Sequence, residues 1–320
     1  MKFTRLALPL LATVSVFLSL RTNAPAQEDP QDVINEQPQD SSPSSAKPQS
    51  HFIAEAGVVS QAKADIDGGG SMRVNRFDAG VLYRSSLSDN LHLSGSFLFG
   101  VSDYDFSSTG FGEPWETVMF NRLGAQVSRD LSDKWAVRGG GVLMSSRETG
   151  ADFGDSITGG LSLGADYRHS QTLFLSAGLA FVSQLEDDAQ ATPLMALNWK
   201  ASDRWTLRLG SIPFSGGAGA GIEGEYKLSQ NFDLGLGLLY HQRRFRLDDS
   251  GPAPKGIGEE TSVPIRARLG WNLSEKASLH FIAGIATGGE LRLESSNGTR
   301  LTQQDYDPAP YLAVRALFRF

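Results

Sequence analysis

Apolar and polar residues alternate along most of the chain after residue 50. In the run FDAGVLY, one face carries Phe77, Ala79, Val81 and Tyr83. The same period of two recurs at 161–167, 173–181, 232–240 and 263–271. Successive side chains of a β-strand point to opposite faces, so this period is typical of strands. No segment longer than about ten residues has a convincing helical period, and the region 51–320 is therefore predicted to be all-β.

The faces opposite the apolar ones carry Gly, Ser, Thr and charged residues. A soluble β-sandwich would bury its apolar faces between two sheets and would have shorter strands. A membrane barrel turns its apolar face to lipid and its polar face to the lumen. Similar short turns (LSDN, LSDK, ASDR, LSQN and LSEK) begin at Leu87, Leu131, Ala201, Leu228 and Leu273. The connections between them are longer and more variable, and membrane barrels have this asymmetry between periplasmic turns and outer loops.

We therefore predict an antiparallel, transmembrane up-and-down β-barrel of about 14 strands with both termini periplasmic. The expected strands lie near 51–64, 72–84, 91–104, 117–129, 135–147, 156–168, 172–184, 193–200, 205–212, 218–227, 232–246, 261–272, 277–293 and 310–320. The segment GSIPFSGGAGAG could instead be one loop, which leaves twelve strands possible. A barrel of this size lies between side-chain-filled and open barrels, so we expect a narrow wet lumen unless loops or the N-terminal segment fill it.

Two other segments precede the barrel. Residues 1–26 have the form of a secretory signal peptide: Lys2 and Arg5, then an apolar run, then Ala24 and Ala26 in an A-x-A arrangement with cleavage after Ala26. An uncleaved anchor is the alternative. Residues 27–50 hold few apolar side chains, so we expect a disordered periplasmic tether, or alternatively a plug or partner-binding arm. The chain has no cysteine, which excludes disulfides and thiolate metal sites.

Four of the five tryptophans lie within a few residues of a short turn. They are Trp135, Trp199, Trp205 and Trp271. Amphipathic rings prefer the interface between membrane and water. The ordinary β propensity of aromatic residues explains their presence in strands but not their position beside one class of turn. We interpret these tryptophans as a periplasmic membrane-interface girdle.

The chain ends on YLAVRALFRF, with one face formed by Leu312, Val314, Ala316, Phe318 and Phe320. This ending resembles the C-terminal assembly signal of Gram-negative outer-membrane β-barrel proteins. The resemblance implies an outer-membrane location, insertion by the outer-membrane barrel assembly machinery, and contact with lipid and lipopolysaccharide. The segments RRFRLDD, ATGGELRLE and DYDPAP also resemble a barrel family that is catalogued as a domain of unknown function, which implies no activity. Oligomeric state is left open.

The net charge and the charge of the inward face favour some functions over others. The net charge is −7, and the signal peptide carries three bases, so the rest of the chain is at −10 and a nucleic-acid partner is not expected. Alternation places twelve bases but six acids on the inward face, and the predicted pore-lining residues are Arg76, Arg122, Arg266, Arg268 and Arg315. We predict a passive channel for small polar solutes with a weak anion preference. The alternative is a closed structural or surface-interaction barrel that acts through its loops. A fatty-acid channel fits the polar inward face less well.

Candidate catalytic and metal chemistry is sparse. His92 and Ser94 resemble the His-x-Ser pair of the outer-membrane phospholipase family, but their expected face and depth differ from that family, and no third group is evident in the sequence. A lipid-modifying enzyme is therefore a distant alternative, and we predict that the protein is not an enzyme and needs no cofactor. The acidic connections suit loose divalent bridging to lipopolysaccharide, and we predict no specific metal site.

The unbroken alternation up to the last residue predicts that the C-terminus directs assembly. Changing Phe318 and Phe320 to Ser should sharply reduce the amount of heat-modifiable, folded protein in the outer-membrane fraction. The matched change Phe174→Ser, on the opposite face of an interior strand, should reduce it less. Wild-type levels of folded protein in the double variant would contradict the assembly-signal prediction.

Overall fold

The computed structural model describes residues 50–110, 112–214 and 217–320. Its strands are β1 (Ser50–Asp65), β2 (Ser71–Ser88), β3 (Leu91–Ser107), β4 (Thr117–Asp130), β5 (Trp135–Glu148), β6 (Ile157–Arg168), β7 (Leu173–Gln184), β8 (Asp187–Lys200), β9 (Trp205–Phe214), β10 (Gly217–Lys227), β11 (Phe232–Arg246), β12 (Ile257–Ser274), β13 (Ala277–Glu294), β14 (Arg300–Tyr306) and β15 (Ala309–Arg319). A short 3₁₀-helix, η2 (Gly154–Ser156), precedes β6. The predicted signal peptide and tether lie outside the described residues, except for Ser50 at the start of β1.

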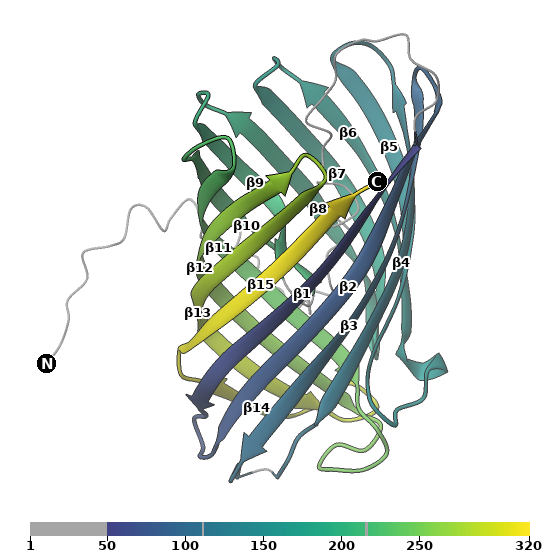
Figure 1. The fold of residues 1–320 in the computed structure, drawn as a ribbon. Coiled ribbons are helices and arrows are strands. Elements are labelled where there is room, and N and C mark those ends of the chain that lie inside the picture. The colour runs from purple at the N-terminus through teal and green to yellow at the C-terminus, as the bar shows by residue number, and fades with distance from the viewer. Residues whose placement is uncertain (1–49, 111, 215–216) are drawn as a thin grey trace, which may run out of the picture.

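The strands form a closed antiparallel barrel with 14 positions (Figure 1). Each strand pairs with its neighbours in sequence, and β15 closes the ring against β1 from Ile53↔Arg319 to Gln61↔Tyr311. β14 and β15 share the last position, because β14 pairs with the loop-side end of β13 and β15 pairs with the rest of it. The segment that sequence left open between one loop and two strands forms β9 and β10, so the 14-stranded prediction is confirmed and the twelve-stranded one is not.

The repeated short turns lie at one end of the barrel, which we call the turn side. In several of these turns a serine hydroxyl accepts backbone hydrogen bonds from the residues that restart the next strand. Ser202 accepts from Arg204 at 3.3 Å and from Trp205 at 3.1 Å, and Ser132, Ser170 and Ser229 make the equivalent pairs of contacts. Local side-chain capping of this kind fixes a tight turn, which explains why the same tetrapeptide recurs.

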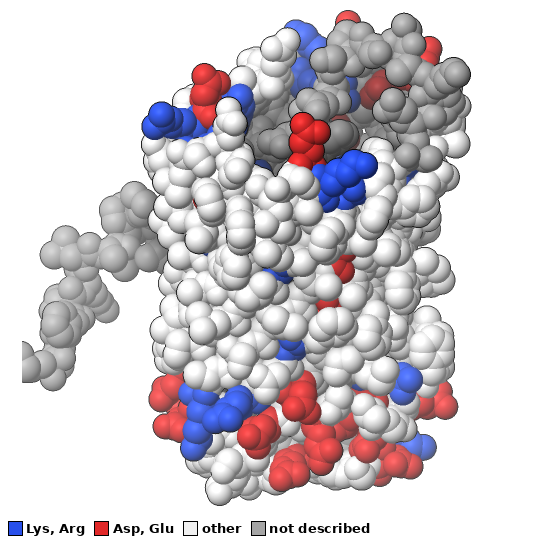
Figure 2. Space-filling view, viewed as in Figure 1, with Lys and Arg blue, Asp and Glu red and all other residues white. Residues whose placement is uncertain are grey.

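The outer surface carries a broad apolar belt. Exposed residues of this belt include Val81, Phe97, Leu123, Leu143, Leu161, Leu163, Phe181, Leu236, Ile265 and Leu312. Figure 2 shows few charged atoms across the middle of the viewed face. The end of the barrel opposite the turns, which we call the loop side, carries a band of acidic and basic groups. No helix among the described residues is long and apolar enough to cross a membrane.

The strands extend further on the loop side than the sequence predicts. The expected loop LEDDAQATP is a two-residue turn, Leu185 and Glu186, followed directly by β8. Glu186 has a φ of 54°, a conformation that glycine or asparagine usually takes in turns, so the usual turn signal is missing. Similarly, β12 begins at Ile257, four residues before the expected start of that strand. Beyond the apolar belt the outward face of a strand no longer has to be apolar, so the hydrophobic alternation that predicts a strand is lost.

The wall is weakest between β8 and β9. These strands pair only over Leu197–Lys200 and Thr206–Leu209 in the described structure, whereas β7 and β8 pair along nearly their whole length. The pairing ends beside Gly210, which has a φ of 123° that an L-residue with a side chain rarely adopts. The loop-side part of β8 therefore has one neighbouring strand instead of two.

Candidate functional site

The interior of the barrel is the candidate site, and its two ends differ in chemistry. The loop-side half is filled by an apolar cluster that draws on most of the strands surrounding it. The cluster contains Ala64, Ile66, Met72, Val74, Tyr104, Phe106, Trp115, Val118, Phe245, Leu247, Ala253, Leu291, Leu293, Tyr306 and Ala309. The turn-side half is lined by charged and small side chains. The interior is thus closed towards the loops and polar towards the turns.

The closure depends on β11 leaving the wall. β11 pairs with β10 only as far as Ala220↔Tyr240. Beyond that point it pairs with β12 alone and reaches across the interior, where Arg246 lies opposite Arg147 of β5 in a parallel bridge. All residues from His241 to Leu247 are buried, on both faces of the strand. The loop-side half is therefore narrower than the turn-side half.

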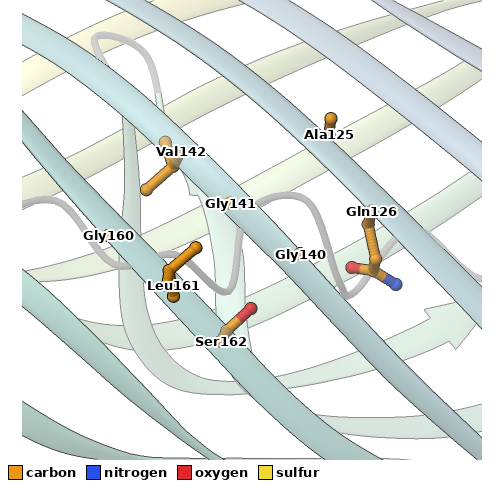
Figure 3. Close-up of a pocket in the computed structure, with 8 residues that line it drawn as sticks. All are labelled: Ala125, Gln126, Gly140, Gly141, Val142, Gly160, Leu161 and Ser162. Carbon is orange, nitrogen blue, oxygen red and sulfur yellow. The ribbon is translucent and has the colours of Figure 1, made fainter.

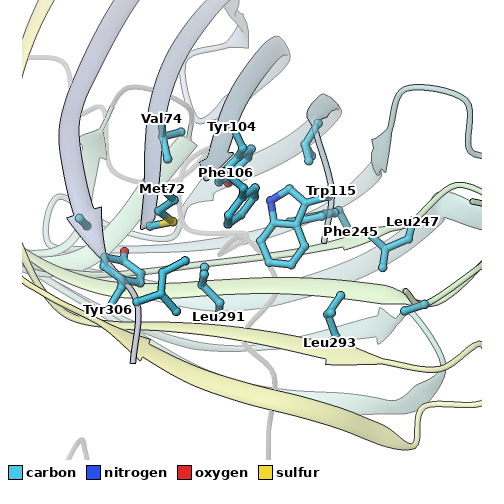
Figure 4. Close-up of a cluster of buried hydrophobic side chains, with 14 of the residues drawn as sticks. Met72, Val74, Tyr104, Phe106, Trp115, Phe245, Leu247, Leu291, Leu293 and Tyr306 are labelled. Atoms are coloured by element: carbon cyan, nitrogen blue, oxygen red, sulfur yellow. The ribbon is translucent and has the colours of Figure 1, made fainter. Parts of the chain in front are cut away.

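Aromatic side chains form the centre of the apolar cluster (Figure 4). Trp115, from the connection between β3 and β4, meets Phe245 edge to face with ring centroids 5.1 Å apart. It contacts Tyr104 and Phe106 in the same way, at 5.7 and 5.4 Å. The Phe245 ring covers Gly258 of β12 so closely that a Cβ atom there would lie 2.4 Å from the ring. Aromatic residues from opposite walls thus pack directly on each other and fill the opening.

A buried carboxylate stands beside this cluster. Both oxygens of Glu260 on β12 accept hydrogen bonds from Arg76 on β2 at 2.7 Å. The hydroxyl of Tyr104 donates to the same carboxylate at 2.5 Å and that of Tyr306 at 3.3 Å. An ion pair out of contact with water is tolerated only when further hydrogen bonds satisfy its atoms. The two hydroxyls satisfy the carboxylate further, and together with Arg76 they connect β2, β3 and β14 to β12.

The arginines at the end of β11 contact four other parts of the barrel. Arg243 donates to Ser102 on β3. Arg244 donates to Glu294 on β13 at 2.5 Å and to the carbonyl of Leu185 at 3.0 Å. Arg246 donates to Glu186 in the β7–β8 turn at 2.5 Å and to the carbonyl of Asp155 at 3.1 Å. Planar guanidinium groups hold several acceptors at once, so the run RRFR fixes β11 across the interior.

In the turn-side half, arginines and acids alternate along the wall from β9 to β12. Arg266 donates to Glu223 at 2.6 Å. Arg268 donates to Glu225 at 2.6 Å and to Asp233 at 2.5 Å. Arg208 donates to Glu225 at 2.8 Å and is the most exposed of these arginines. These cross-strand pairs neutralise most of the charge while leaving a polar surface.

The five arginines predicted to line a pore all lie on inward faces and are all buried. Arg266 and Arg268 belong to the turn-side ladder, and Arg315 of β15 pairs with Glu55 of β1 at 2.5 Å. Arg122 lies on the inward face of β4. Arg76 instead forms part of the closure in the loop-side half. The structure therefore brings Arg266 and Arg268 together and places Arg76 elsewhere.

Glu260 is the functional residue that sequence reasoning missed. The segment GIGEE was expected to be an outer loop, whereas it lies in β12. A signal was available, because Ser262 and Glu260 continue the inward-facing series that contains Arg266 and Pro264. The same extension would have added an inward-facing acid to β12.

The expected His92–Ser94 pair is not the contact that forms. His92 instead meets Ser86, at 3.1 Å from Nδ1, and Asp130, at 3.2 Å from Nε2. Ser86 and His92 are direct cross-strand partners beside a turn, and Asp130 begins the next turn. All three lie at the turn-side mouth, where His92 and Asp130 are partly exposed. Strand pairing accounts for this arrangement, and we assign it a structural role.

The predicted girdle and assembly residues face outwards. Trp135, Trp199, Trp205 and Trp271 are exposed near the turn side, where Trp135 packs on Tyr167 and Trp205 on Tyr226, at 4.6 and 4.9 Å between ring centroids. Leu312, Val314, Ala316, Phe318 and Phe320 share the outer side of the seam between β15 and β1. The amide of Phe320 donates to the carbonyl of Phe52 at 2.9 Å. The last residue of the chain thus takes part in closing the ring.

A shallow pocket in the wall of β4–β6 provides little chemistry (Figure 3). It is lined by Ala125, Gln126, Gly140, Gly141, Val142, Gly160, Leu161 and Ser162. Glycines form its floor, and Gln126 and Ser162 are the polar side chains that it offers. Ligand sites usually combine an apolar cavity with several converging polar groups. Among the described residues, no group of three or more His, Asp or Glu side chains is arranged to hold a metal ion.

Comparison with known proteins supports the fold. No protein-family model matches the sequence, and no curated protein matches it. The structure is similar to that of a TodX monoaromatic hydrocarbon channel deletion mutant (12% identity, TM-score 0.50, 86% of this chain and 91% of that chain). It is also similar to an outer-membrane channel from Pseudomonas putida F1 (12% identity, TM-score 0.46, 85% and 95%) and to a Pseudomonas aeruginosa FadL homologue (10% identity, TM-score 0.44, 85% and 90%). The chain shares its closed antiparallel β-barrel fold with the TodX channel.

Removing the Glu260 carboxylate should destabilise the loop-side half, because Arg76 would keep a buried charge without its main partner. We expect Glu260→Ala to lower the free energy of unfolding by about 3–5 kcal/mol, measured by denaturant titration of the refolded barrel in detergent micelles. Asp203→Ala breaks the exposed pair with Lys200 and should cause no measurable change. Equal stability of the two variants would contradict the role assigned to Glu260.

Proposed function

We propose that this protein is a passive channel of the outer membrane for small polar solutes, closed on its loop side in the conformation described. The observation that carries the proposal is the charged, ion-paired wall of the turn-side half. An interior meant only for packing would be filled by apolar side chains, as the cluster around Trp115 and Phe245 is. A polar wall is instead compatible with water and with polar solutes.

Small residues provide space along this wall. Alternation puts Gly80, Gly124, Gly140, Gly160 and Gly237 on inward faces of different strands. A fourteen-stranded ring is wider than the eight-stranded barrels that side chains fill completely and narrower than open porins of 16–18 strands. At these glycines no side chain projects into the interior. This supports a narrow lumen that admits small solutes.

The outer-membrane location is supported by the belt and by the C-terminal residues. The exposed apolar belt would be unfavourable in water, and it matches the lipid-facing surface of membrane barrels. We accordingly propose membrane lipid and lipopolysaccharide as the surroundings of the belt, and the outer-membrane assembly machinery as the partner that reads Leu312–Phe320. The neighbours in fold are channels, but at 12% identity or less their solutes do not transfer to this chain.

Ion pairing makes any charge selectivity weak. At least eight of the twelve bases predicted to face inwards lie within 4 Å of an acid. Glu260 and Asp130, which the alternation count omitted, add to the inward acids. Bases still outnumber acids on the wall, so a modest anion preference remains the expectation.

A closed structural barrel is the second candidate, and the filled loop-side half favours it. An interior blocked by a fifteen-residue apolar cluster and several buried ion pairs would suit a protein that acts only through its outer loops. The two functions differ in one measurable property, which is the passage of ions.

Purified, refolded protein in planar lipid bilayers should show discrete, low-conductance openings, smaller than those of open sixteen-stranded porins. Trp115→Ala and Phe245→Ala, which remove the centre of the closure, should raise the conductance or the time spent open. Heat-modifiable gel mobility checks that each variant is folded. A folded protein that remains silent in both forms would support the structural barrel and overturn the channel.

A salt gradient across the same bilayer measures selectivity. We expect a reversal potential that indicates a weak anion preference, decreasing at high ionic strength because salt screens the wall charge. Changing Arg266 and Arg268 to Gln leaves the acids of the ladder in excess, so the preference should shift towards cations. A strong cation preference in the wild type that does not change in this double variant would show that wall charge does not control permeation.

A further inference from the structure

The loop-side ends of four consecutive barrel positions form one continuous sheet. It consists of residues 241–246 of β11, 257–262 of β12, 288–294 of β13 and 300–306 of β14, and we call it the flap. Strand pairing is maintained through all four segments, from β11 to β12, from β12 to β13 and from β13 to β14. Ion pairs inside the flap strengthen it, since Arg244 meets Glu259 and Glu294, and Arg292 meets Glu259 and Glu290.

Irregularities in all four strands lie along one line at the base of the flap. On β11, pairing with β10 stops at Tyr240. Between β12 and β13 the register shifts between Thr261 and Val263, beside Gly288, whose φ is 57°. The last barrel position is interrupted at residues 307–308, between β14 and β15. β-Bulges, positive-φ glycines and strand breaks are places where a sheet can bend with little loss of pairing.

Backbone pairing joins the two edges of the flap to the rest of the wall only sparsely. On the β11 edge, one bridge links Arg246 to Arg147 of β5. On the β14 edge, one isolated bridge links Tyr306 to Ile66, with two backbone hydrogen bonds beside it, between residues 67 and 305 and between residues 307 and 65. Elsewhere in the wall, neighbouring strands share long ladders, such as the nine consecutive pairs of β1 and β15.

Side chains make most of the remaining connections across these edges. Glu260 receives Arg76 and Tyr104, Arg243 reaches Ser102, and Arg246 reaches Glu186. Arg244 adds hydrogen bonds to the carbonyl of Leu185. Most of these contacts are charged. When a charged contact separates, water forms hydrogen bonds with the freed groups and replaces those that the partner made. When an apolar contact of the same size separates, its surface stays exposed to water without such compensation. Apolar contacts cross the same edges, because Phe245 and Leu291 of the flap belong to one buried cluster with Trp115 of the wall.

We propose that the flap is the gate of the channel: it bends about this line, and the contacts of Arg76, Arg243 and Arg246 hold it shut. The proposal rests on the proposed channel function. When the flap moves outwards it takes Phe245 away from Trp115 and uncovers Ser102 on β3. The turn-side lumen is then continuous with the loop side.

The chain has no cysteine, so the flap can be locked with a single engineered disulfide. Arg147→Cys with Arg246→Cys places two thiols on bridge partners of adjacent strands, a spacing of about 4.8 Å that a disulfide spans. The oxidised form should lose the conductance of the reduced form, and reduction should restore it. The control pair, Ser94→Cys with Gln126→Cys, joins partners of β3 and β4 away from the flap, and its oxidation should leave conductance unchanged.

Flap motion can also be measured without conductance. Ser102→Cys puts a buried thiol beneath Arg243, and its rate of labelling by a membrane-impermeant maleimide reports on opening. Adding Arg246→Gln should raise this rate by about tenfold or more, because contacts that cross the flap edge are lost. Adding Arg292→Gln is the matched control, because the ion-pair partners of Arg292 lie inside the flap. That variant should leave the rate near its starting value.

The outcomes of these experiments distinguish failure of the proposed gate from failure of the proposed channel function. Conductance that survives the locked disulfide would overturn the gate and leave the channel in place. Equal labelling of the Arg246→Gln and Arg292→Gln variants would overturn the hinge and the contacts assigned to it. Faster labelling in Arg246→Gln, with no conductance in any variant, would support the flap motion and overturn the proposed channel function.

Discussion

The requirement that strands inside a membrane be paired on both sides governs most of this molecule, and the loop-side part of β8 is the exception. Inside a membrane an unpaired backbone amide or carbonyl has no water to bind, so a sheet can cross only as a closed ring. The seam between β1 and β15 meets this requirement, and the final residue, Phe320, still donates its amide to Phe52. The serine-capped turns on the turn side serve the same end, because they return the chain to the next strand within a few residues. The apolar belt and the polar interior both follow from the alternation that a closed ring imposes.

A polar interior raises a second requirement, which is that buried charge be paired. The turn-side half meets it with a ladder in which Arg266 and Arg268 alternate with Glu223 and Asp233. The loop-side half meets it with the Arg76–Glu260 pair and two tyrosine hydroxyls. The two halves differ more in what surrounds these ion pairs than in the ion pairs themselves. The ladder lies among glycines, whereas Glu260 lies against packed aromatic rings, so arginine–carboxylate chemistry contributes to a polar wall in one half and to a closure in the other.

The sequence predicted the strands correctly in the part of the barrel that the apolar belt surrounds. Within the belt one face of each strand must be apolar, and the expected strands agree with the observed ones there, including the exposed assembly residues of β15. Beyond the belt that constraint disappears. The acids Asp187 and Asp188 were interpreted as loop and lie in β8, and Glu260 was interpreted as loop and lies at the centre of the closure. Inward-facing arginines could be predicted from alternation, but their partners on distant strands could not, because Arg76 and Glu260 are joined only by the curvature of the ring.

The same reasoning explains where a gate can exist in such a barrel. The last outward apolar residues before the flap are Tyr240 on β11, Ile265 on β12 and Ile285 on β13, and the irregular line follows directly after them. Below that line, separating two strands would expose unpaired backbone to lipid at a cost of several kcal/mol for each group. Above it, the same groups would meet water and keep hydrogen-bonding partners. The flap begins where the belt ends, so bending at this line is compatible with the ring closure that the membrane demands of the rest of the wall.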